Sequence, residues 1–207
     1  MVRLTREESQ ARTRSLLIEA ARALISEKGF ATATVRDIAE AAGFSQGAFY
    51  SNFPDKDSVL LELAERHQIE ERARIEGALA TAGGAADAMA AVEKWALTLN
   101  ADRSFAALAI ELQLQALRSP EFAKAYRALD RKHRALLGEL IARLFVALGK
   151  RPPDDPAAIA TGFAVLVRGM ALQGGDTGAS ESGRVVIAFL KALIASAPDE
   201  TPNRQRG

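Results

Sequence analysis

The sequence predicts an all-α protein, and three observations support this fold class. Apolar residues recur at spacings of three and four along most of the chain, which is the period of an α-helix. The 15 glycines and 7 prolines gather in a few short clusters between these periodic segments. Runs of β-branched residues, which favour strands, are nearly absent. We therefore expect helices separated by short breaks, without a sheet.

Four helices are expected in the N-terminal part, each with a start or stop signal. Thr34, Ser45 and Asp55 are residue types that cap helix N-termini, and Gly29 and Gly43 suit the positive φ that follows a helix end. The expected ranges are Arg6–Lys28, Val35–Ala42, Gln46–Asn52 and Lys56–Ala80. The last of these is the only continuous element that the sequence shows joining the two parts of the chain.

Five further helices follow the break at residues 81–84. Their expected ranges are Ala85–Ala101, Ser104–Leu117, Pro120–Gly149, Pro156–Gly174 and a last segment around Val186–Ile194. The stretch Ile110–Gln115 alternates with period two, as a strand does, but a lone strand has no partner in this chain. We therefore predict a helix there. The segment from Pro198 to Gly207 reads as a flexible tail.

Composition excludes several classes of function. The 207 residues are 48% hydrophobic, include no cysteine and carry a formal net charge of +1. Thiolate metal sites and disulfides are therefore impossible, and His67 and His133 lack ligand-spaced partners, so we expect no metal and no cofactor. No apolar run reaches the roughly 20 residues that span a bilayer. The polar segment Met1–Gln10 is unlike a secretory signal, so we expect a cytoplasmic protein without a membrane partner.

The two short helices joined by Gly43 form the minimal unit that reads DNA, a helix-turn-helix. A small core that fixes their crossing is expected from Ile38, Phe44, Phe49 and Phe53. This arrangement leaves the second helix with small or polar residues on its outer face. Such a face can enter the major groove without steric obstruction.

The segment from Thr34 to Lys56, TVRDIAEAAGFSQGAFYSNFPDK, closely resembles the DNA-binding domain of TetR/AcrR-family transcriptional regulators. The resemblance extends back to about Thr13 and forward to about Leu61, whereas the rest of the chain fits the family only in outline. It implies a head at residues 1–55, a helical effector-binding and dimerisation domain at 56–197, and a flexible tail at 198–207. The resemblance further implies a homodimer that binds a palindromic double-stranded DNA operator and responds to a small-molecule effector.

The resemblance carries over a set of DNA-contacting positions. They are Thr34, Arg36, Ser45, Gln46, Gly47, Ala48, Tyr50, Asn52 and Lys56. By chemistry, Arg36 and Gln46 can read guanine and adenine through paired hydrogen bonds. Thr34, Tyr50 and Lys56 suit phosphate, and Lys56 lies in the first turn of its helix, where the helix N-terminus also favours an anion.

Some of these residues have a structural alternative. Arg36 can pair with Glu40 one helical turn away, and Asn52 can terminate its own helix. A cluster of N-terminal arginines can reach DNA or can simply be solvated. This cluster consists of Arg3, Arg6, Arg12 and Arg14.

Two further sets are predicted for the C-terminal part, and plain core packing is the alternative for each. A candidate effector pocket consists of Trp95, Phe105, Gln113, Tyr126, His133, Phe163 and Met170. A candidate dimer interface, on the last two helices, consists of Ile159, Phe163, Leu166, Val167, Val186, Phe189, Leu190 and Leu193. In the family these two helices form a four-helix bundle with their copies.

The leading hypothesis is a repressor that its effector releases from DNA. An activator or a corepressor-dependent regulator would carry the same DNA-contacting residues. An enzyme is not expected, because the sequence contains no nucleophile–base pair, paired-carboxylate motif or glycine-rich phosphate loop. A helical adaptor that binds only protein is the alternative from another class.

Overall fold

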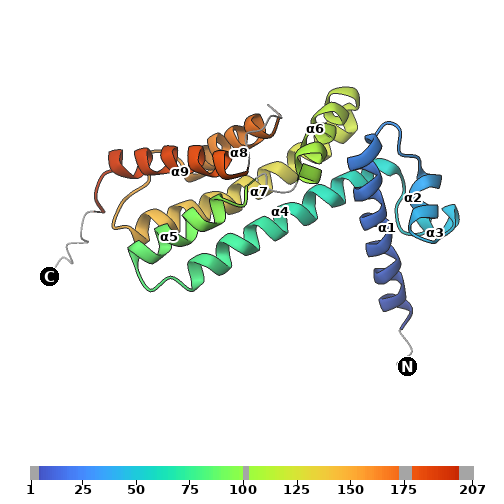
Figure 1. Ribbon diagram of the computed structural model, residues 1–207, viewed down its shortest axis with the longest axis horizontal. Coiled ribbons are helices and arrows are strands. Elements are labelled where there is room, and N and C mark those ends of the chain that lie inside the picture. The colour runs from blue at the N-terminus through green and yellow to red at the C-terminus, as the bar shows by residue number, and fades with distance from the viewer. Residues whose placement is uncertain (1–4, 100–102, 173–178, 201–207) are drawn as a thin grey trace. The chain divides into compact units, whose positions relative to one another are not determined.

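The computed structural model describes residues 5–99, 103–172 and 179–200, without the side chains of residues 103–105 and 179–180. Over these residues the chain forms helices and one isolated β-bridge (Figure 1). The helices are α1 (Arg6–Lys28), α2 (Val35–Ala41), α3 (Gln46–Tyr50), α4 (Lys56–Ala80), α5 (Ala85–Ala96), α6 (Arg103–Arg118), α7 (Pro120–Ala147), α8 (Pro156–Leu172) and α9 (Ala179–Ser196). The predicted all-α class is confirmed, and Ile110–Gln115 is helical.

The predicted start signals act as caps. The side-chain oxygens of Thr34, Ser45 and Asp55 accept hydrogen bonds from the backbone three residues on, at 3.1, 3.2 and 2.7 Å. Gly29 and Gly43 have φ values of 81° and 79°, which favour glycine. Helix boundaries in this region therefore follow local chemistry that is visible in the sequence.

Several helices end one or two residues before their predicted ends, and α5 differs most. α5 ends at Ala96 rather than near Ala101, because the chain tightens there into three-residue turns. The backbone N–H of Thr98 donates to the carbonyl of Trp95 at 2.8 Å, and the Thr98 hydroxyl donates to the same oxygen at 2.7 Å. A threonine hydroxyl that bonds to a nearby carbonyl competes with continuation of the helix.

The chain divides into two compact units. The first unit contains the chain up to His67 together with Arg103–Arg127, and the second contains Gln68–Asp102 and the chain from Ala128 on. Two continuous helices, α4 and α7, contribute residues to both of these units, whereas the sequence singled out α4 alone as a joining element. The predicted boundary at residue 55/56 separates a DNA-binding head from an effector-binding and dimerisation domain. This boundary is one of function, and it stays a prediction.

The first unit is built on α1, which packs against α2, α3 and α6. The small core predicted for the helix-turn-helix is largely confirmed, since Ile38, Phe49 and Phe53 are at most 1% exposed. Phe44 is only half-buried. Phe49 and Phe53 also contact each other, with ring centroids 5.5 Å apart. This core fixes how α2 and α3 cross.

In the second unit, α9 packs against α5 and α8 (Figure 1). The approach to α5 is very close at Gly183, where an added Cβ would lie 2.3 Å from the carbonyl oxygen of Ala96. Phe145 on α7 is fully buried in the core of this unit. Within the described ranges, no helix combines the length and apolar character that a membrane crossing needs.

The described part of the chain after α9 pairs with the residues that follow α7. The predicted tail starts at Pro198, but the backbone of Pro198–Glu200 pairs with residues 149–151, including a bridge between Lys150 and Asp199. The Lys150 ammonium also lies 2.6 Å from the Asp199 carboxylate. These three residues of the predicted tail thus have backbone partners, and its other residues, 201–207, lie outside the described residues, so the flexible tail stays a prediction.

Candidate nucleic-acid interface

The outer face of α3 is open to a partner. Gln46, Gly47 and Tyr50 are exposed, and the Tyr50 side chain remains 57% accessible. Ala48 is half-buried. Gln46 is thus the residue in α3 whose amide can form two hydrogen bonds with a base edge, as the sequence predicts.

The two capping hydroxyls retain a free donor. Thr34 and Ser45 are exposed, and each uses its side-chain oxygen to accept the backbone bond of its cap. A hydroxyl carries one proton besides its acceptor lone pairs. Among the described residues neither hydroxyl donates, so both can donate to phosphate from the N-termini of α2 and α3.

Arg36 occupies the first turn of α2 and forms the predicted alternative contact. Its Nε donates to Oε1 of Glu40 at 2.8 Å, one helical turn further on. The bond to Glu40 raises the pKa of Arg36 above its usual value. Both side chains are exposed, so this contact leaves Arg36 accessible to DNA.

Lys56 has structural partners within the first unit. Its ammonium donates to the carbonyl oxygens of Phe30 and Ala33, at 2.6 and 2.9 Å, and lies 4.3 Å from the centre of the Phe30 ring. Burial lowers its pKa. An ammonium has three donors, so one remains for phosphate. Sequence reasoning assigned Lys56 only the phosphate and missed its two carbonyl partners.

Asn52 and Arg14 are held inside the first unit. The Asn52 amide donates to the carbonyl of Ala48 at 2.8 Å, which supports its alternative role as a helix terminator. Arg14 donates to the backbone carbonyl of Asn52 and to the Glu62 carboxylate, and it stacks 4.0 Å from the centre of the Phe53 ring. These contacts favour a structural role for both residues over DNA binding.

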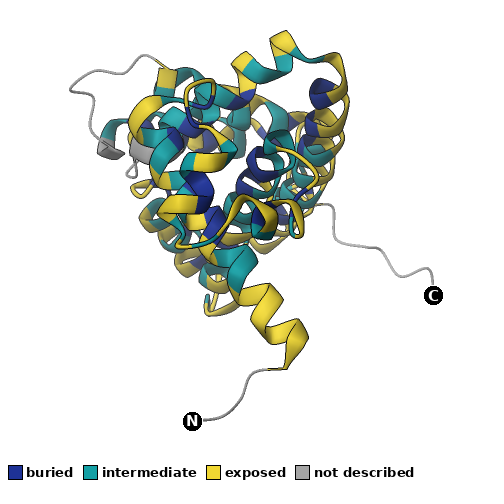
Figure 2. Cartoon of the chain, turned by 90° about the vertical axis from the view of Figure 1, so that its right-hand side faces the viewer, coloured by how far each residue is buried: buried dark blue, intermediate teal, exposed yellow. Residues whose placement is uncertain are grey.

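The N-terminal turns of α1 differ from this anchored region. Residues 5–12 are exposed throughout, and Figure 2 shows them as the yellow helix nearest the N label. They include Arg6 and Arg12, for which both alternatives stay open. Arg3 lies outside the described residues.

Helix α6 contributes contacts to the first unit that sequence reasoning missed. The Gln115 amide donates to both carboxylate oxygens of Asp57, at 2.9 and 3.1 Å. Glu111 approaches Gly29 so closely that an added Cβ would lie 2.9 Å from its Oε1. The only sequence signal was polar residues on an otherwise apolar helix. These contacts connect α6 with the end of α1 and the start of α4.

Another missed contact fixes the start of α2. The Lys28 ammonium lies 2.7 Å from Oδ2 of Asp37, and the same oxygen accepts the backbone N–H of Thr34 at 3.0 Å. These bonds, led by the one from Lys28, lower the pKa of Asp37 to about 2. The first turn of α2 is therefore tied to the end of α1.

The residues predicted for an effector pocket fall in both units. Gln113 and Tyr126 belong to the first unit and contact each other through Nε2 and the phenol oxygen, at 3.4 Å. In the second unit, Trp95 and Phe163 pack against the same apolar clusters, and the Trp95 indole donates to Glu71 at 3.2 Å. Met170 is half-buried on α8, and the Phe105 side chain lies outside the described residues. As a ligand site, this set remains a prediction.

His133 lies in a charged cluster of the second unit. Asp130, which is 6% exposed, accepts from Arg168 on α8 at 2.5 Å and from Arg134 at 3.2 Å. Burial lowers the pKa of His133 to about 4; Asp130 opposes this effect, and Arg168, Arg72 and Arg134 add to it. Its buried Nδ1 has no hydrogen-bond partner among the described residues. The ring is therefore neutral at pH 7.

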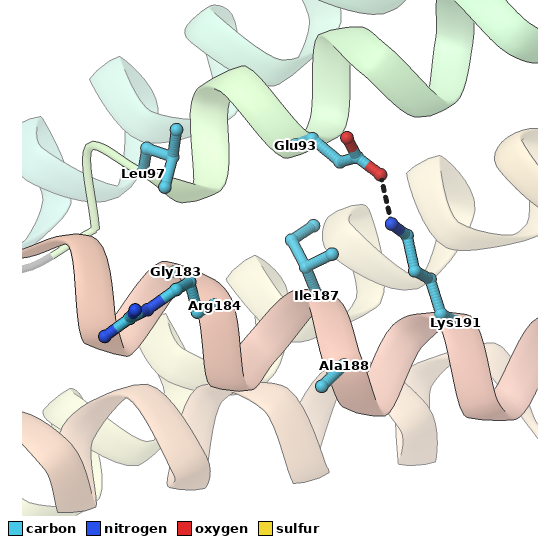
Figure 3. A pocket seen from close by; sticks show the side chains of 7 residues that line it. All are labelled: Glu93, Leu97, Gly183, Arg184, Ile187, Ala188 and Lys191. Carbon is cyan, nitrogen blue, oxygen red and sulfur yellow. Dashed lines mark ion pairs between the residues drawn. The ribbon is translucent and has the colours of Figure 1, made fainter.

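A hollow of about 340 Å³ lies between α5 and α9 (Figure 3). Its lining consists of Glu93, Leu97, Gly183, Arg184, Ile187, Ala188 and Lys191. The Lys191 ammonium lies 2.7 Å from the Glu93 carboxylate across this lining. None of the predicted pocket residues lines this hollow.

Most of the predicted interface residues serve the chain's own core. Ile159, Val186 and Leu190 are at most 9% exposed. Phe163, Leu166, Val167 and Leu193 pack against the apolar clusters of the second unit. Phe189 differs from the rest of the predicted set because it is 57% exposed. The helical stripe that sequence reasoning chose faces inward, and Val165, which it omitted, is 62% exposed.

Comparisons with known proteins match both parts of the chain. The model of the family described as bacterial regulatory proteins, tetR family, matches residues 17–63. A second model, described as BetI-type transcriptional repressor, C-terminal, matches residues 84–197, which is more than half of the chain.

Individual relatives agree with these models. The transcriptional regulator BetI from Agrobacterium fabrum is 27% identical over 193 residues, 90% of each chain. The regulator TtgR from Pseudomonas putida is 43% identical over 65 residues, so the match spans only 31% of this chain and 30% of TtgR. The regulator FadR from Bacillus subtilis, solved with stearoyl-CoA, superposes with a TM-score of 0.67 at 20% identity, over 85% of this chain and 96% of FadR.

Proposed function

Because the chain belongs to the TetR family of bacterial transcriptional regulators, with a C-terminal domain of the BetI type, we propose that it is a homodimeric repressor released from its operator by a small molecule. Its relatives are DNA-binding regulators, some named repressors, and not enzymes. The dimer, the palindromic operator and the release by an effector are the parts proposed here, together with a cytoplasmic location.

The observation that carries the DNA-binding role is the exposed end of the helix-turn-helix. Gln46, Gly47 and Tyr50 are accessible on α3, and the hydroxyls of Thr34 and Ser45 each keep a free donor. In this arrangement Gln46 and Arg36 read bases, and the hydroxyls, Tyr50 and the third Lys56 donor bind phosphate. Asn52 supports this face by closing α3.

The dimer is supported by exposed apolar residues on the last two helices. Val165 on α8 and Phe189 on α9 are 62% and 57% exposed, and Leu172 is 54% exposed. Large exposed apolar side chains on neighbouring helices are typical of an interface between subunits. We place the interface on this outward face and assign the inward stripe, including Leu190, to the core.

The effector site is proposed for the second unit, around Trp95 and Phe163. Both side chains are half-buried at the junction of two apolar clusters, and the Trp95 indole is oriented by Glu71. His133 adds a neutral ring whose Nδ1 has no acceptor or donor partner among the described residues. Apolar side chains with a small number of polar groups among them are typical of sites for small molecules.

Selection from random double-stranded DNA tests this function. A dimeric reader enriches an inverted repeat whose half-sites are centred about 34–36 Å apart, one helical turn. An activator would enrich the same repeat but would raise transcription from a reporter promoter that contains it. Enrichment of no sequence by the intact protein would instead support the protein-binding adaptor.

A further inference from the structure

Glu40 places a negative charge on α2, beside the surface proposed to meet DNA. Its side chain is 62% exposed and that of Arg36 is 71% exposed. The pair therefore contributes little to the stability of the fold. A carboxylate near phosphates also opposes binding to DNA of any sequence. Glu40 is thus expected to cost affinity unless it improves recognition.

The geometry of the pair leaves the reading edge of Arg36 free. Glu40 Oε1 accepts from Nε of Arg36 at 2.8 Å, and the two terminal nitrogens donate to no acceptor within the described ranges. Those two nitrogens can donate in parallel to O6 and N7 of guanine. The bond at Nε therefore holds the guanidinium without occupying its terminal edge.

The backbone of α2 keeps this pair directed outward. Ile38 and Ala39 are fully buried on another side of the helix, and the Lys28–Asp37 contact fixes its first turn. A guanidinium held on a fixed helix loses less conformational entropy when it binds than a free side chain does. The structure thus provides both a rigid support and a directed donor.

We propose that Glu40 is a positioning residue that holds Arg36 for recognition of one guanine in each half-site. This proposal rests on the proposed DNA-binding function. It requires Glu40 to have two opposite effects, because the carboxylate lowers affinity for random DNA and raises discrimination at one base pair. A surface ion pair without a role in recognition would produce only the first effect.

The test compares the intact protein with Glu40→Ala, Glu40→Gln, Arg36→Ala and the double variant. For each protein, affinity is measured for the selected operator and for a copy in which the guanine–cytosine pair assigned to Arg36 is replaced by adenine–thymine. The ratio of these two affinities is the measure of discrimination. Glu65→Ala is the matched control, because it removes the same charge from an exposed position of the first unit. Circular dichroism verifies that each variant folds.

We expect Glu40→Ala to lower the ratio about fivefold to tenfold while affinity for random DNA is unchanged or higher. Glu40→Gln, which keeps an acceptor, should fall between Glu40→Ala and the wild type. The double variant should discriminate no worse than Arg36→Ala alone, and Glu65→Ala should keep the wild-type ratio.

Two outcomes overturn the proposal without touching the proposed function. In the first, Glu40→Ala keeps the wild-type ratio within twofold while Arg36→Ala loses it, so Arg36 needs no support. In the second, Arg36→Ala itself keeps the ratio, so Arg36 does not read this base pair. Failure of the proposed function looks different, because the wild-type protein would then select no operator.

Discussion

The ammonium of Lys56, the first residue of α4, lies 2.6 Å from the carbonyl oxygen of Phe30, just beyond the end of α1. The same ammonium binds the carbonyl of Ala33, which directly precedes the cap of α2. One side chain thus connects the start of α4 with the loop between α1 and α2. A displacement of the first turn of α4 would therefore also displace the N-terminus of α2.

Replacement of Lys56 by alanine should weaken both the fold and DNA binding. Two carbonyl oxygens lose a charged donor, which should lower the free energy of unfolding by about 1–3 kcal/mol, measured by urea denaturation. The lost phosphate contact should also lower the slope of log affinity against log salt concentration by about one unit. Weaker binding with an unchanged salt dependence would show that Lys56 acts only through the fold.

Replacement of Gln46 by alanine should have a different signature. Gln46 is exposed and is expected to read a base edge, so one operator position should lose about 1–3 kcal/mol of discrimination. The salt dependence should stay at the wild-type value, because no phosphate contact is removed. Selection from random DNA with both proteins checks this result. Identical selected sites would show that α3 does not read sequence through Gln46.

The contrast between Gln46 and Lys56 shows what sequence reasoning can reach. Caps, glycine turns and apolar spacing act within a few residues, so most helix boundaries and the exposure of Gln46 could be predicted. The partners of Lys56 and Arg14 lie 23 to 48 residues away, and only the folded chain shows them. Long polar side chains can therefore be assigned a chemistry from the sequence, but not a partner.

The buried face of α8 and α9 was harder to predict than the partners of these long polar side chains. These helices are apolar over a wide arc, so periodicity does not distinguish the face toward the core from the face toward a second subunit. The structure distinguishes the two faces at neighbouring positions, since Phe189 is 57% exposed and Leu190 is 5% exposed.

This difference predicts opposite results for two aspartate substitutions. Phe189→Asp puts the charge on the outward face, so the protein should stay helical but become monomeric, as measured by sedimentation. Phe163→Asp buries an unpaired charge between two apolar clusters and should unfold the second unit or lower its unfolding midpoint sharply. If Phe189→Asp stays a native dimer, the outward face that carries Phe189 is not the dimer interface.

His133 predicts a pH dependence of stability. Its pKa is about 4 in the folded chain and 6.5 in an unfolded one, so the unfolded state binds more protons between these values. The contribution of the neutral His133 ring to the free energy of unfolding should therefore be fully present above pH 6.5. It should be lost progressively as the pH decreases toward 4. After solvent screening, the loss between pH 7 and pH 5 should be about 1 kcal/mol. His133→Gln, measured by urea denaturation at both pH values, should reduce this loss, and an equal loss in both proteins would assign it to other groups.

The proposed release mechanism predicts that effector and operator oppose each other reciprocally. α4 and α7 each carry residues of both units, so they are the continuous elements through which binding in one unit can affect the other. If a small molecule weakens operator binding by some factor, the operator must weaken its binding by the same factor, typically 5- to 150-fold. A compound that raises the unfolding temperature of the protein would be titrated with and without saturating operator, and scrambled half-sites serve as the control. Equal affinities in both titrations would show that the compound does not act as an inducer, and tighter binding with operator would identify it as a corepressor.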